Sequence, residues 1–338
     1  MSAIPRGAVW VRVPRFVGDA VMIHAAIAPL RATGLPLVLW GPGWVLDLFE
    51  GSSDYAAVFP EPTRKYSPLQ AAAMLRTHRP AALVNFPKSI RPLAAALLAG
   101  VPLRLGCGDR GASLLCSHSV AFYRQDTPFV DRYASVVHRA FPGLPHDPPF
   151  RPFQPRAEAL EAAARERSTL GLGPYAVFAL GANSWSKRLS LDAYADLGRA
   201  LEGRGIRSVV LGAGAEDQRL ADELAARFPS VLSQVGRGGM AYAAAWVCGA
   251  EVLVGGDSGL THLGGICGIP VLAVYGPTRP RHSAPVGPQV TVLRKEPLDC
   301  LECMRGDCPV EGHPCMNGLE HGQLLGALLS LLRSGPGQ

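Results

Sequence analysis

The sequence has no long hydrophobic run. None of its apolar stretches reaches the roughly 18 residues that a membrane-spanning helix needs, and the longest candidate, residues 92–105, is interrupted by glycine, proline and arginine. Residues 1–13 also lack an apolar segment followed by a small-residue cleavage site, which a secretory signal would contain. We therefore expect a cytoplasmic protein.

Dense runs of Lys or Arg are missing as well, and so is a basic stripe interleaved with aromatic residues. The net charge is +6 over 338 residues, and the sequence pI is about 9.0. A modest positive excess favours anionic partners such as nucleotides or phosphorylated lipids, without choosing among them. Because no basic stripe is present, we do not expect a nucleic-acid partner.

Short apolar segments alternate with helical patterns along the chain, which shows no short-period repeat and no low-complexity tract. This alternation predicts an α/β protein whose strands pair in parallel in doubly wound sheets. In the first part we expect strands at residues 8–13, 35–40, 81–86 and 101–106, and helices at 20–32 and 91–99. In the second part we expect strands at 175–180, 207–211, 251–255 and 270–275, and helices at 157–170, 191–201, 216–228, 240–248 and 258–267.

Six prolines crowd residues 142–155. Proline clusters of this kind are typical of linkers, and a chain of 338 residues suits two domains of about 150 residues each. We therefore expect an N-terminal domain at residues 1–155. A C-terminal domain at 156–338 would include a cysteine-rich segment at 300–315.

Asp19 closes the motif Phe16-Val-Gly-Asp19, which lies between the first expected strand and its helix. Gly18 would allow a tight turn there. Asp19 has two interpretations. It caps the helix, or its carboxylate acts as a general base that takes the proton of an acceptor hydroxyl.

Two further polar loops follow expected strands. Lys187, in Gly181-Ala-Asn-Ser-Trp-Ser-Lys-Arg188, supplies either a point charge for a phosphate or an ordinary solvated charge. Glu216 and Asp217 end the motif Leu211-Gly-Ala-Gly-Ala-Glu-Asp217. Either acid could accept hydrogen bonds from ribose hydroxyls, or both complement the dipole of the following helix.

The motif Gly255-Gly-Asp-Ser-Gly-Leu-Thr-His262 follows a buried strand and opens a helix. The backbone N–H groups of Ser258, Gly259 and Leu260 would point out of the helix N-terminus, where the dipole favours an anion such as a pyrophosphate. Asp257 would repel a phosphate, so we expect it to bind sugar hydroxyls or to hold the loop geometry.

Four of the eight cysteines cluster near the C-terminus with the spacing Cys300-x2-Cys303-x4-Cys308-x6-Cys315. In a cytoplasmic chain such a cluster indicates a metal site more than disulfides. Four thiolates could hold structural zinc or iron, and reduced or redox-active thiols are the alternative. The other four are scattered over apolar segments and are expected to be small core residues: Cys107, Cys116, Cys248 and Cys267.

Taken together and in this order, these motifs resemble the ADP-heptose:lipopolysaccharide heptosyltransferases, glycosyltransferase family 9. The resemblance runs from about Val9 to about Met316. It is closest in residues 16–19, 86–91, 99–106, 181–182 with 187–188, 257–262 and 274–278. The segment Phe86-Pro-Lys-Ser89 resembles heptosyltransferase II more than heptosyltransferase I.

The resemblance implies a GT-B fold, in which two Rossmann-like domains with parallel sheets face a central cleft. It implies inverting transfer of heptose from ADP-L-glycero-D-manno-heptose to inner-core lipopolysaccharide, with no cofactor required for catalysis. In this family Asp19 would be the base. The donor would contact Lys187, Glu216, Asp257, Ser258, Gly259 and Leu260.

We place the acceptor beside Lys88, Ser89 and Arg91, which are otherwise solvated charges and polar groups of a loop and helix. The acceptor of this family is a lipid-linked saccharide, so peripheral contact with the inner membrane is expected.

The sequence also departs from the family pattern. Leu180 replaces a usual proline, and Leu189 and Ser190 replace an aromatic residue and a proline in a region that shapes the donor pocket. A related nucleotide-sugar transferase with another donor therefore remains an alternative. The cysteine cluster resembles one in relatives that modify proteins and hold iron, so a protein acceptor is a second alternative. A nucleotide- or metal-binding protein without turnover is a third.

Overall fold

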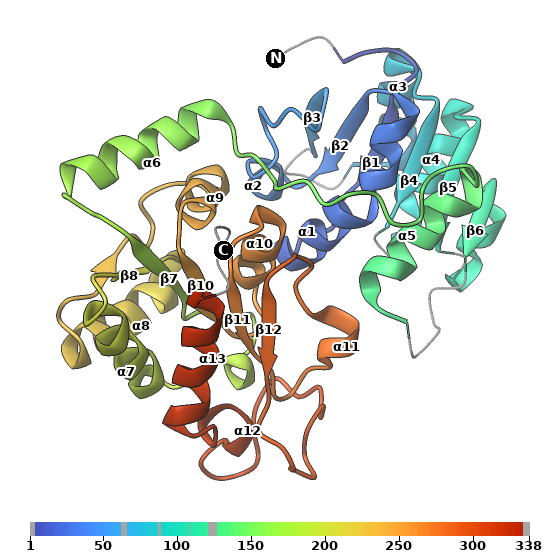
Figure 1. The fold of residues 1–338 in the computed structure, drawn as a ribbon. Helices are drawn as coiled ribbons and strands as arrows, with labels where there is room; N and C mark the ends of the chain where they lie inside the picture. Colours follow the sequence, from blue (N-terminus) through green and yellow to red (C-terminus); the bar gives the residue numbers. More distant parts are fainter. Residues whose placement is uncertain (1–3, 62–65, 87–88, 108, 121–126, 334–338) are drawn as a thin grey trace. The chain divides into compact units, whose positions relative to one another are not determined.

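The computed structural model describes residues 4–61, 66–86, 89–107, 109–120 and 127–333. The chain forms two compact units, Met1–Pro149 (unit 1) and Phe150–Gln338 (unit 2). Each unit is built on a six-stranded sheet whose strands all pair in parallel, with helices packed against it (Figure 1). The prediction of an α/β protein with two Rossmann-like halves, as in the GT-B fold, is confirmed.

Unit 1 contains the first six strands. They are β1 (Val9–Arg12), β2 (Leu37–Gly41), β3 (Ala57–Pro60), β4 (Ala82–Asn85), β5 (Leu103–Cys107) and β6 (His118–Val120). The helices are α1 (Val17–Ala26), α2 (Gly43–Leu46), α3 (Pro68–His78), α4 (Arg91–Ala99) and α5 (Phe129–Ala140), with 3-10 turns η1 (Ala28–Thr33) and η2 (Asp109–Leu114). The strand order is β3-β2-β1-β4-β5-β6.

Unit 2 repeats the alternation. Its strands are β7 (Tyr175–Ala179), β8 (Arg207–Val210), β9 (Leu232–Ser233), β10 (Val252–Gly255), β11 (Val271–Val274) and β12 (Val290–Leu293). Its helices are α6 (Ala157–Thr169), α7 (Leu191–Glu202), α8 (Gly214–Arg227), α9 (Met240–Cys248), α10 (Gly259–Cys267), α11 (Pro280–Ser283), α12 (Pro314–Asn317) and α13 (His321–Arg333), with the 3-10 turn η3 (Trp185–Lys187). The strand order is β12-β11-β10-β7-β8-β9.

The two sheets share one topology. When strands are numbered from the first strand of each unit, both sheets have the order 3-2-1-4-5-6, which is the Rossmann order. In such sheets the connections leave in opposite directions on either side of the first strand. The carboxyl ends of the first and fourth strands then flank a crevice that binds ligands. The candidate sites are therefore the loops after β1 and β4 and the loops after β7 and β10.

Central strands are apolar because both of their faces are covered by helices, as is usual in parallel sheets. Strands β1, β4, β7 and β10 are buried along their whole length. In unit 1 the fully buried Trp10 packs edge-on against Trp40, with 6.2 Å between ring centroids. In unit 2 the core joins Phe178 and Tyr194 to helix α13 through Leu328.

Helix α1 begins at Val17, three residues before the expected start. Phe16 has extended backbone angles (φ −96°, ψ 130°) and is the N-cap residue, so Gly18 and Asp19 already belong to the first helical turn. The expectation of a tight turn at Gly18 was therefore wrong. The helix also ends earlier than expected, at Ala26, because Pro29 has no N–H group and the chain continues as η1.

The division between the units falls between Pro149 and Phe150, a few residues before the expected boundary after Pro155. The segment that follows packs on unit 2. The N–H of the buried Phe153 donates to the carbonyl of Ile266 (2.8 Å). This hydrogen bond ties the proline-rich segment to the end of helix α10.

A disulfide joins Cys248 to Cys267, with Cα atoms 5.1 Å apart. It links the last residue of α9 to the last residue of α10. The expectation of two separate core cysteines was wrong for this pair, because packing of the two helices brings their ends together. Cys116 is a free, half-buried thiol, and the side chain of Cys107 lies outside the described residues.

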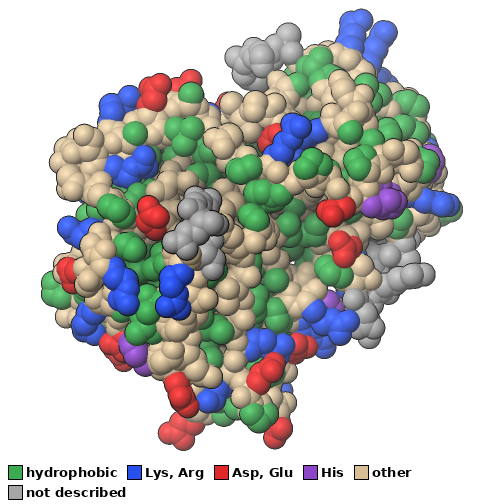
Figure 2. Space-filling model, viewed as in Figure 1, with side chains coloured by type: hydrophobic (Ala, Val, Ile, Leu, Met, Phe, Trp, Pro, Cys, Tyr) green, Lys and Arg blue, Asp and Glu red, His purple; other side chains and the backbone are tan. Residues whose placement is uncertain are grey.

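Charged side chains are dispersed over the surface that Figure 2 shows. On this face Lys and Arg side chains lie among Asp and Glu side chains, and the described residues do not gather into one basic stripe. Among the described helices, none combines the length and apolar character that crossing a membrane requires.

His24 on helix α1 is buried in a polar network of unit 1. Its Nδ1 lies 2.6 Å from the Tyr55 hydroxyl, and its Nε2 lies 3.3 Å from Arg31 Nη2 and 3.8 Å from Asp54 Oδ2. Burial, with a smaller contribution from the charge of Arg31, lowers the pKa of His24 to about 3. The imidazole is therefore neutral in the folded protein at pH 7.

We expect acid to destabilise unit 1 through this histidine. The unfolded chain protonates His24 near pH 6.5 and the folded chain only near pH 3. Stability is therefore lost as the pH falls through this window, by about 2 kcal/mol at pH 5. Urea unfolding at pH 7 and pH 5 measures the loss, which His24→Asn should remove. The exposed His321→Asn is the control, and an equal loss in His24→Asn and wild type would contradict the prediction.

Candidate functional site

The clearest cluster of polar groups lies where β7 and β10 end in unit 2. These strands are neighbours, and Gly255 at the end of β10 pairs with Ala179 at the end of β7. Because the strands end at the same level, the loop carrying Lys187 meets the loop carrying Asp257. Lys187 and Asp257 are 70 residues apart in the sequence.

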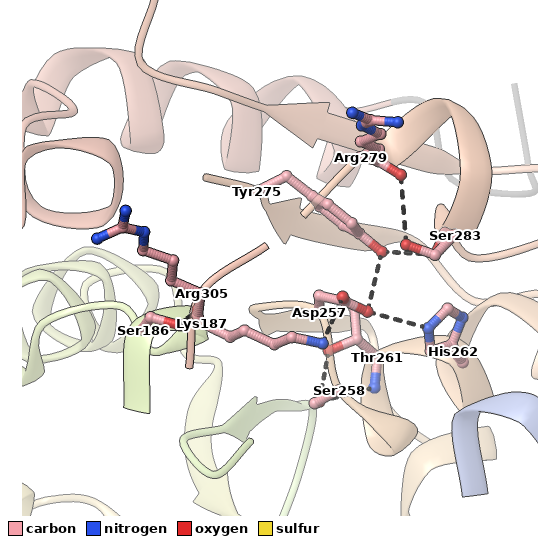
Figure 3. A network of polar contacts seen from close by, with 10 residues as sticks. All are labelled: Ser186, Lys187, Asp257, Ser258, Thr261, His262, Tyr275, Arg279, Ser283 and Arg305. Atoms are coloured by element: carbon pink, nitrogen blue, oxygen red, sulfur yellow. Dashed lines mark hydrogen bonds and ion pairs between the residues drawn. The ribbon is translucent and has the colours of Figure 1, made fainter. Parts of the chain in front are cut away.

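Asp257 is the centre of this cluster (Figure 3). Lys187 Nζ lies 2.8 Å from Asp257 Oδ2, while His262 Nε2 and the Tyr275 hydroxyl lie 3.3 and 3.4 Å from Oδ1. Burial of the carboxyl opposes its ionisation, but the hydrogen bond with His262 and the charge of Lys187 outweigh this effect. They hold the pKa of Asp257 well below its usual value. Asp257 is therefore an ionised carboxylate with both oxygens engaged.

Helix α10 presents its N-terminus beside this carboxylate. Ser258 is the N-cap residue, and its Oγ accepts a hydrogen bond from the N–H of Thr261 (3.4 Å). Gly259 and Leu260 are the first two helical residues and are only partly buried. The first N–H groups of an α-helix have no carbonyl partner within the helix. Together with the helix dipole, they favour an anion at this position.

Gly256 explains how the two loops come so close. A methyl group at this position would overlap the carbonyl oxygen of Lys187. The absence of a side chain lets the backbone of turn η3 lie directly against the loop after β10. The ammonium group of Lys187 is thereby held near the N-terminus of α10.

Glu216 lies in the first turn of α8 and is held by two arginines. Arg188 Nη1 and Arg219 Nη2 lie 2.5 and 2.9 Å from Glu216 Oε1. Hydrogen bonds from Arg219 and Arg188 lower the pKa of this exposed carboxyl to about 2. Asp217 instead accepts the N–H of Ala213 (2.8 Å). Of the two acids, Glu216 is the more exposed.

The expected residues of unit 1 follow its two central strands. Asp19 is partly buried in the first turn of α1, after β1. Ser89 and Arg91 are exposed after β4, and the Ser89 carbonyl accepts a hydrogen bond from Asn85 Nδ2 (3.0 Å). Since β1 pairs in parallel with β4, these residues all follow the carboxyl ends of two neighbouring strands. Lys88 lies outside the described residues.

The three departures from the family pattern have structural roles in this chain. Leu180 and Leu189 are buried in the hydrophobic core of unit 2. Ser190 is the N-cap of α7, and its hydroxyl accepts the N–H of Ala193 (3.2 Å). The two leucines therefore belong to the core, and Ser190 stabilises the start of α7.

The cysteine-rich segment folds around a cavity of about 290 Å³. Four of its lining residues are the expected ligands, Cys300, Cys303, Cys308 and Cys315. Among the described residues, however, no three His, Cys, Asp or Glu side chains are placed so that they could hold one metal ion. Burial and the neighbouring thiols raise the pKa of Cys315 to about 11. The structure therefore does not support the expected zinc or iron site.

Sequence reasoning missed three residues of the site. Tyr275 and Arg188 contact Asp257 and Glu216, and His313 donates a hydrogen bond to the carbonyl of Ser186 (2.8 Å). Tyr275 directly follows the buried strand β11, which is a signal of the same kind as those used for the other motifs. His313 gives no such signal, because its partner is 127 residues away.

Comparison with known proteins identifies the family of this chain. The family model described as Glycosyltransferase family 9 (heptosyltransferase) matches residues 73–313. A curated relative, Lipooligosaccharide heptosyltransferase 2 of Haemophilus influenzae, is 23% identical over 314 residues, which cover 87% of this chain and 90% of the relative.

Two solved structures share the fold. The E. coli ADP-heptose lps heptosyltransferase II has a TM-score of 0.80 and 22% identity, covering 96% of this chain and 98% of that one. The glycosyl transferase family 9 structure from Veillonella parvula has a TM-score of 0.84 and 16% identity, covering 98% and 99%. The predicted family, and its similarity to heptosyltransferase II, are confirmed. This chain therefore belongs to glycosyltransferase family 9, the heptosyltransferases, and is a glycosyltransferase.

Proposed function

We propose that the protein transfers heptose from ADP-L-glycero-D-manno-heptose to a lipid-linked saccharide of inner-core lipopolysaccharide, with inversion at the anomeric carbon. The observation that carries this proposal is the Lys187–Asp257 pair beside the N-terminus of α10. A cation and a set of backbone N–H groups there would together bind a diphosphate. The names of the relatives, which include an ADP-heptose lps heptosyltransferase, support this choice of donor and acceptor.

Unit 2 is the proposed donor domain. The diphosphate would accept hydrogen bonds from the N–H groups of Ser258, Gly259 and Leu260 and receive the charge of Lys187. Glu216, ionised and exposed, would accept hydrogen bonds from the ribose hydroxyls. Lys187 and the helix N-terminus would stabilise the negative charge that develops on the leaving ADP. In other transferases a metal ion stabilises this charge. The proposed reaction therefore needs no cofactor.

Unit 1 is the proposed acceptor domain. Asp19 would take the proton of the acceptor hydroxyl, with the acceptor bound near Lys88, Ser89 and Arg91. The hydroxyl oxygen would form a bond to the anomeric carbon while the bond from that carbon to the ADP oxygen breaks. This single displacement releases ADP and inverts the anomeric centre. Because the proposed acceptor is lipid-borne, we also propose a cytoplasmic protein in peripheral contact with the inner membrane.

A nucleotide panel tests the proposed donor. We expect ADP to raise the thermal unfolding temperature more than UDP or GDP at equal concentration, because only the folded protein binds the ligand. Release of ADP from ADP-heptose, measured with a lipopolysaccharide acceptor and with a protein acceptor, then identifies the acceptor class. A larger shift with UDP or GDP would contradict the donor assignment, and turnover only with protein would contradict the saccharide acceptor.

A further inference from the structure

We propose that His313 is a positioning residue for Lys187 and acts through the backbone of Ser186. This inference rests on the proposed function, because it assumes that Lys187 contacts the donor diphosphate. In this arrangement residues 305–313, which lie within the cysteine-rich segment, hold turn η3. They thereby fix where the ammonium group stands relative to helix α10.

The N–H, the hydroxyl and the carbonyl of Ser186 are all hydrogen-bonded to residues of the cysteine-rich segment. Its N–H donates to the carbonyl of Gly306 (3.2 Å), and its hydroxyl donates to the carbonyl of Arg305 (2.6 Å; Figure 3). Its own carbonyl accepts a hydrogen bond from His313 Nε2 (2.8 Å). The residue is 1% exposed, so water cannot replace these partners. The residue immediately before Lys187 is therefore fixed by the C-terminal segment.

His313 is itself held in one orientation. Its ring is buried and stacks on Trp185, with centroids 4.7 Å apart and planes at 26°. The backbone N–H of His313 donates a hydrogen bond to the carbonyl of Val310 (3.2 Å). The Ser186 carbonyl can only accept, so the proton stands on Nε2.

Lys187 is fixed from the opposite side as well. Its carbonyl lies against Gly256, and its ammonium group pairs with Asp257. The turn is thus clamped between the loop after β10 and residues 305–313. Loss of either contact would let the turn move.

The cavity of the cysteine-rich segment gives the turn room for such movement. Ser186 and His313 both line it. Truncation of the imidazole would enlarge this space next to the turn. Truncation should therefore displace Lys187 while the rest of unit 2 keeps its packing.

A double-mutant cycle on ADP affinity tests this inference. Calorimetric titration of ADP compares the wild type with His313→Ala, Lys187→Ala and the double variant. We expect each single change to weaken ADP binding about tenfold and the double variant to bind no more weakly than Lys187→Ala. His313→Gln, whose amide can donate to the same carbonyl, should retain nearly wild-type affinity. His321→Ala, an exposed histidine, is the matched control.

Each outcome is decisive. If His313→Ala weakens ADP binding equally with and without Lys187, the role of His313 is merely structural and the inference is overturned. If Lys187→Ala weakens binding and His313→Ala does not, the inference fails while the proposed donor site stands. A wild type that does not bind ADP overturns the proposed function and the inference with it. Should His313→Ala not fold, the same cycle with His313→Phe, which keeps an aromatic ring beside Trp185 but has no N–H to donate, decides.

Discussion

Replacement of Asp19 by Asn should reduce the rate of sugar transfer by about two to four orders of magnitude, the range expected when a general base is lost. An amide keeps the shape of the side chain but cannot take the proton of the acceptor hydroxyl. ADP affinity should stay unchanged, because Asp19 belongs to unit 1 and the residues proposed to bind the diphosphate belong to unit 2. The measurement is ADP release with acceptor present, together with an ADP titration.

Asp131 provides a matched control for this variant. It lies in the first turn of α5, as Asp19 lies in the first turn of α1. Each acid favours its helix through the dipole, by about 0.3–1 kcal/mol. Asp131→Asn should therefore lose the stabilisation of its helix through the dipole while its turnover stays unchanged. Unchanged turnover in Asp19→Asn would exclude Asp19 as the base and leave it as a helix-stabilising residue.

Asp257→Ala should lower the free energy of unfolding of unit 2 by about 3 kcal/mol. The carboxylate is 9% exposed and its partner Lys187 is 23% exposed. Removal of one member of a largely buried ion pair leaves the other charge without compensation, which costs about 3–5 kcal/mol. His262 and Tyr275 lose a partner in the same variant. We take the lower end of the range because Lys187 keeps some contact with water.

Calorimetric scans with and without ADP measure this effect. If unit 2 binds the nucleotide, the unfolding transition that ADP moves to a higher temperature is the unfolding of unit 2. Glu161→Ala is the control, because the exposed pair of Glu161 with Arg165 should contribute less than about 1 kcal/mol. Asp257→Asn keeps the shape of the side chain and loses its charge. Its loss of stability should lie between those of Asp257→Ala and Glu161→Ala. Equal stability of Asp257→Ala and wild type would show that the ion pair does not hold the loop.

The central part of each sheet could be predicted from the sequence, and its edges could not. Strands β1, β4, β7 and β10 are short apolar runs, because helices cover both of their faces. The edge strands β3, β6, β9 and β12 are only half buried. Strands β6, β9 and β12 contain polar residues, and β3 ends in Pro60, which has no N–H group, so their composition did not distinguish them from loops.

The candidate site divides in a similar way. Lys187, Asp257 and Ser258 were expected because each follows an apolar strand, and the order of the strands brings them together. That Asp257 would pair with Lys187 was not expected, because a pairing depends on how two distant loops meet at Gly256. For the four clustered cysteines, the sequence predicted a site that the structure does not support. Close spacing in the sequence indicated a metal site, but the folded segment places the sulfur atoms around a cavity.

Helix α10 has a consequence for the thermodynamics of donor binding. Residues 261–267 of this helix are all buried, and the disulfide at Cys267 fastens its far end to α9. If this terminus binds the phosphates as proposed, the helix is already held in place before the nucleotide arrives. Association should then cost conformational entropy mainly on the nucleotide's side.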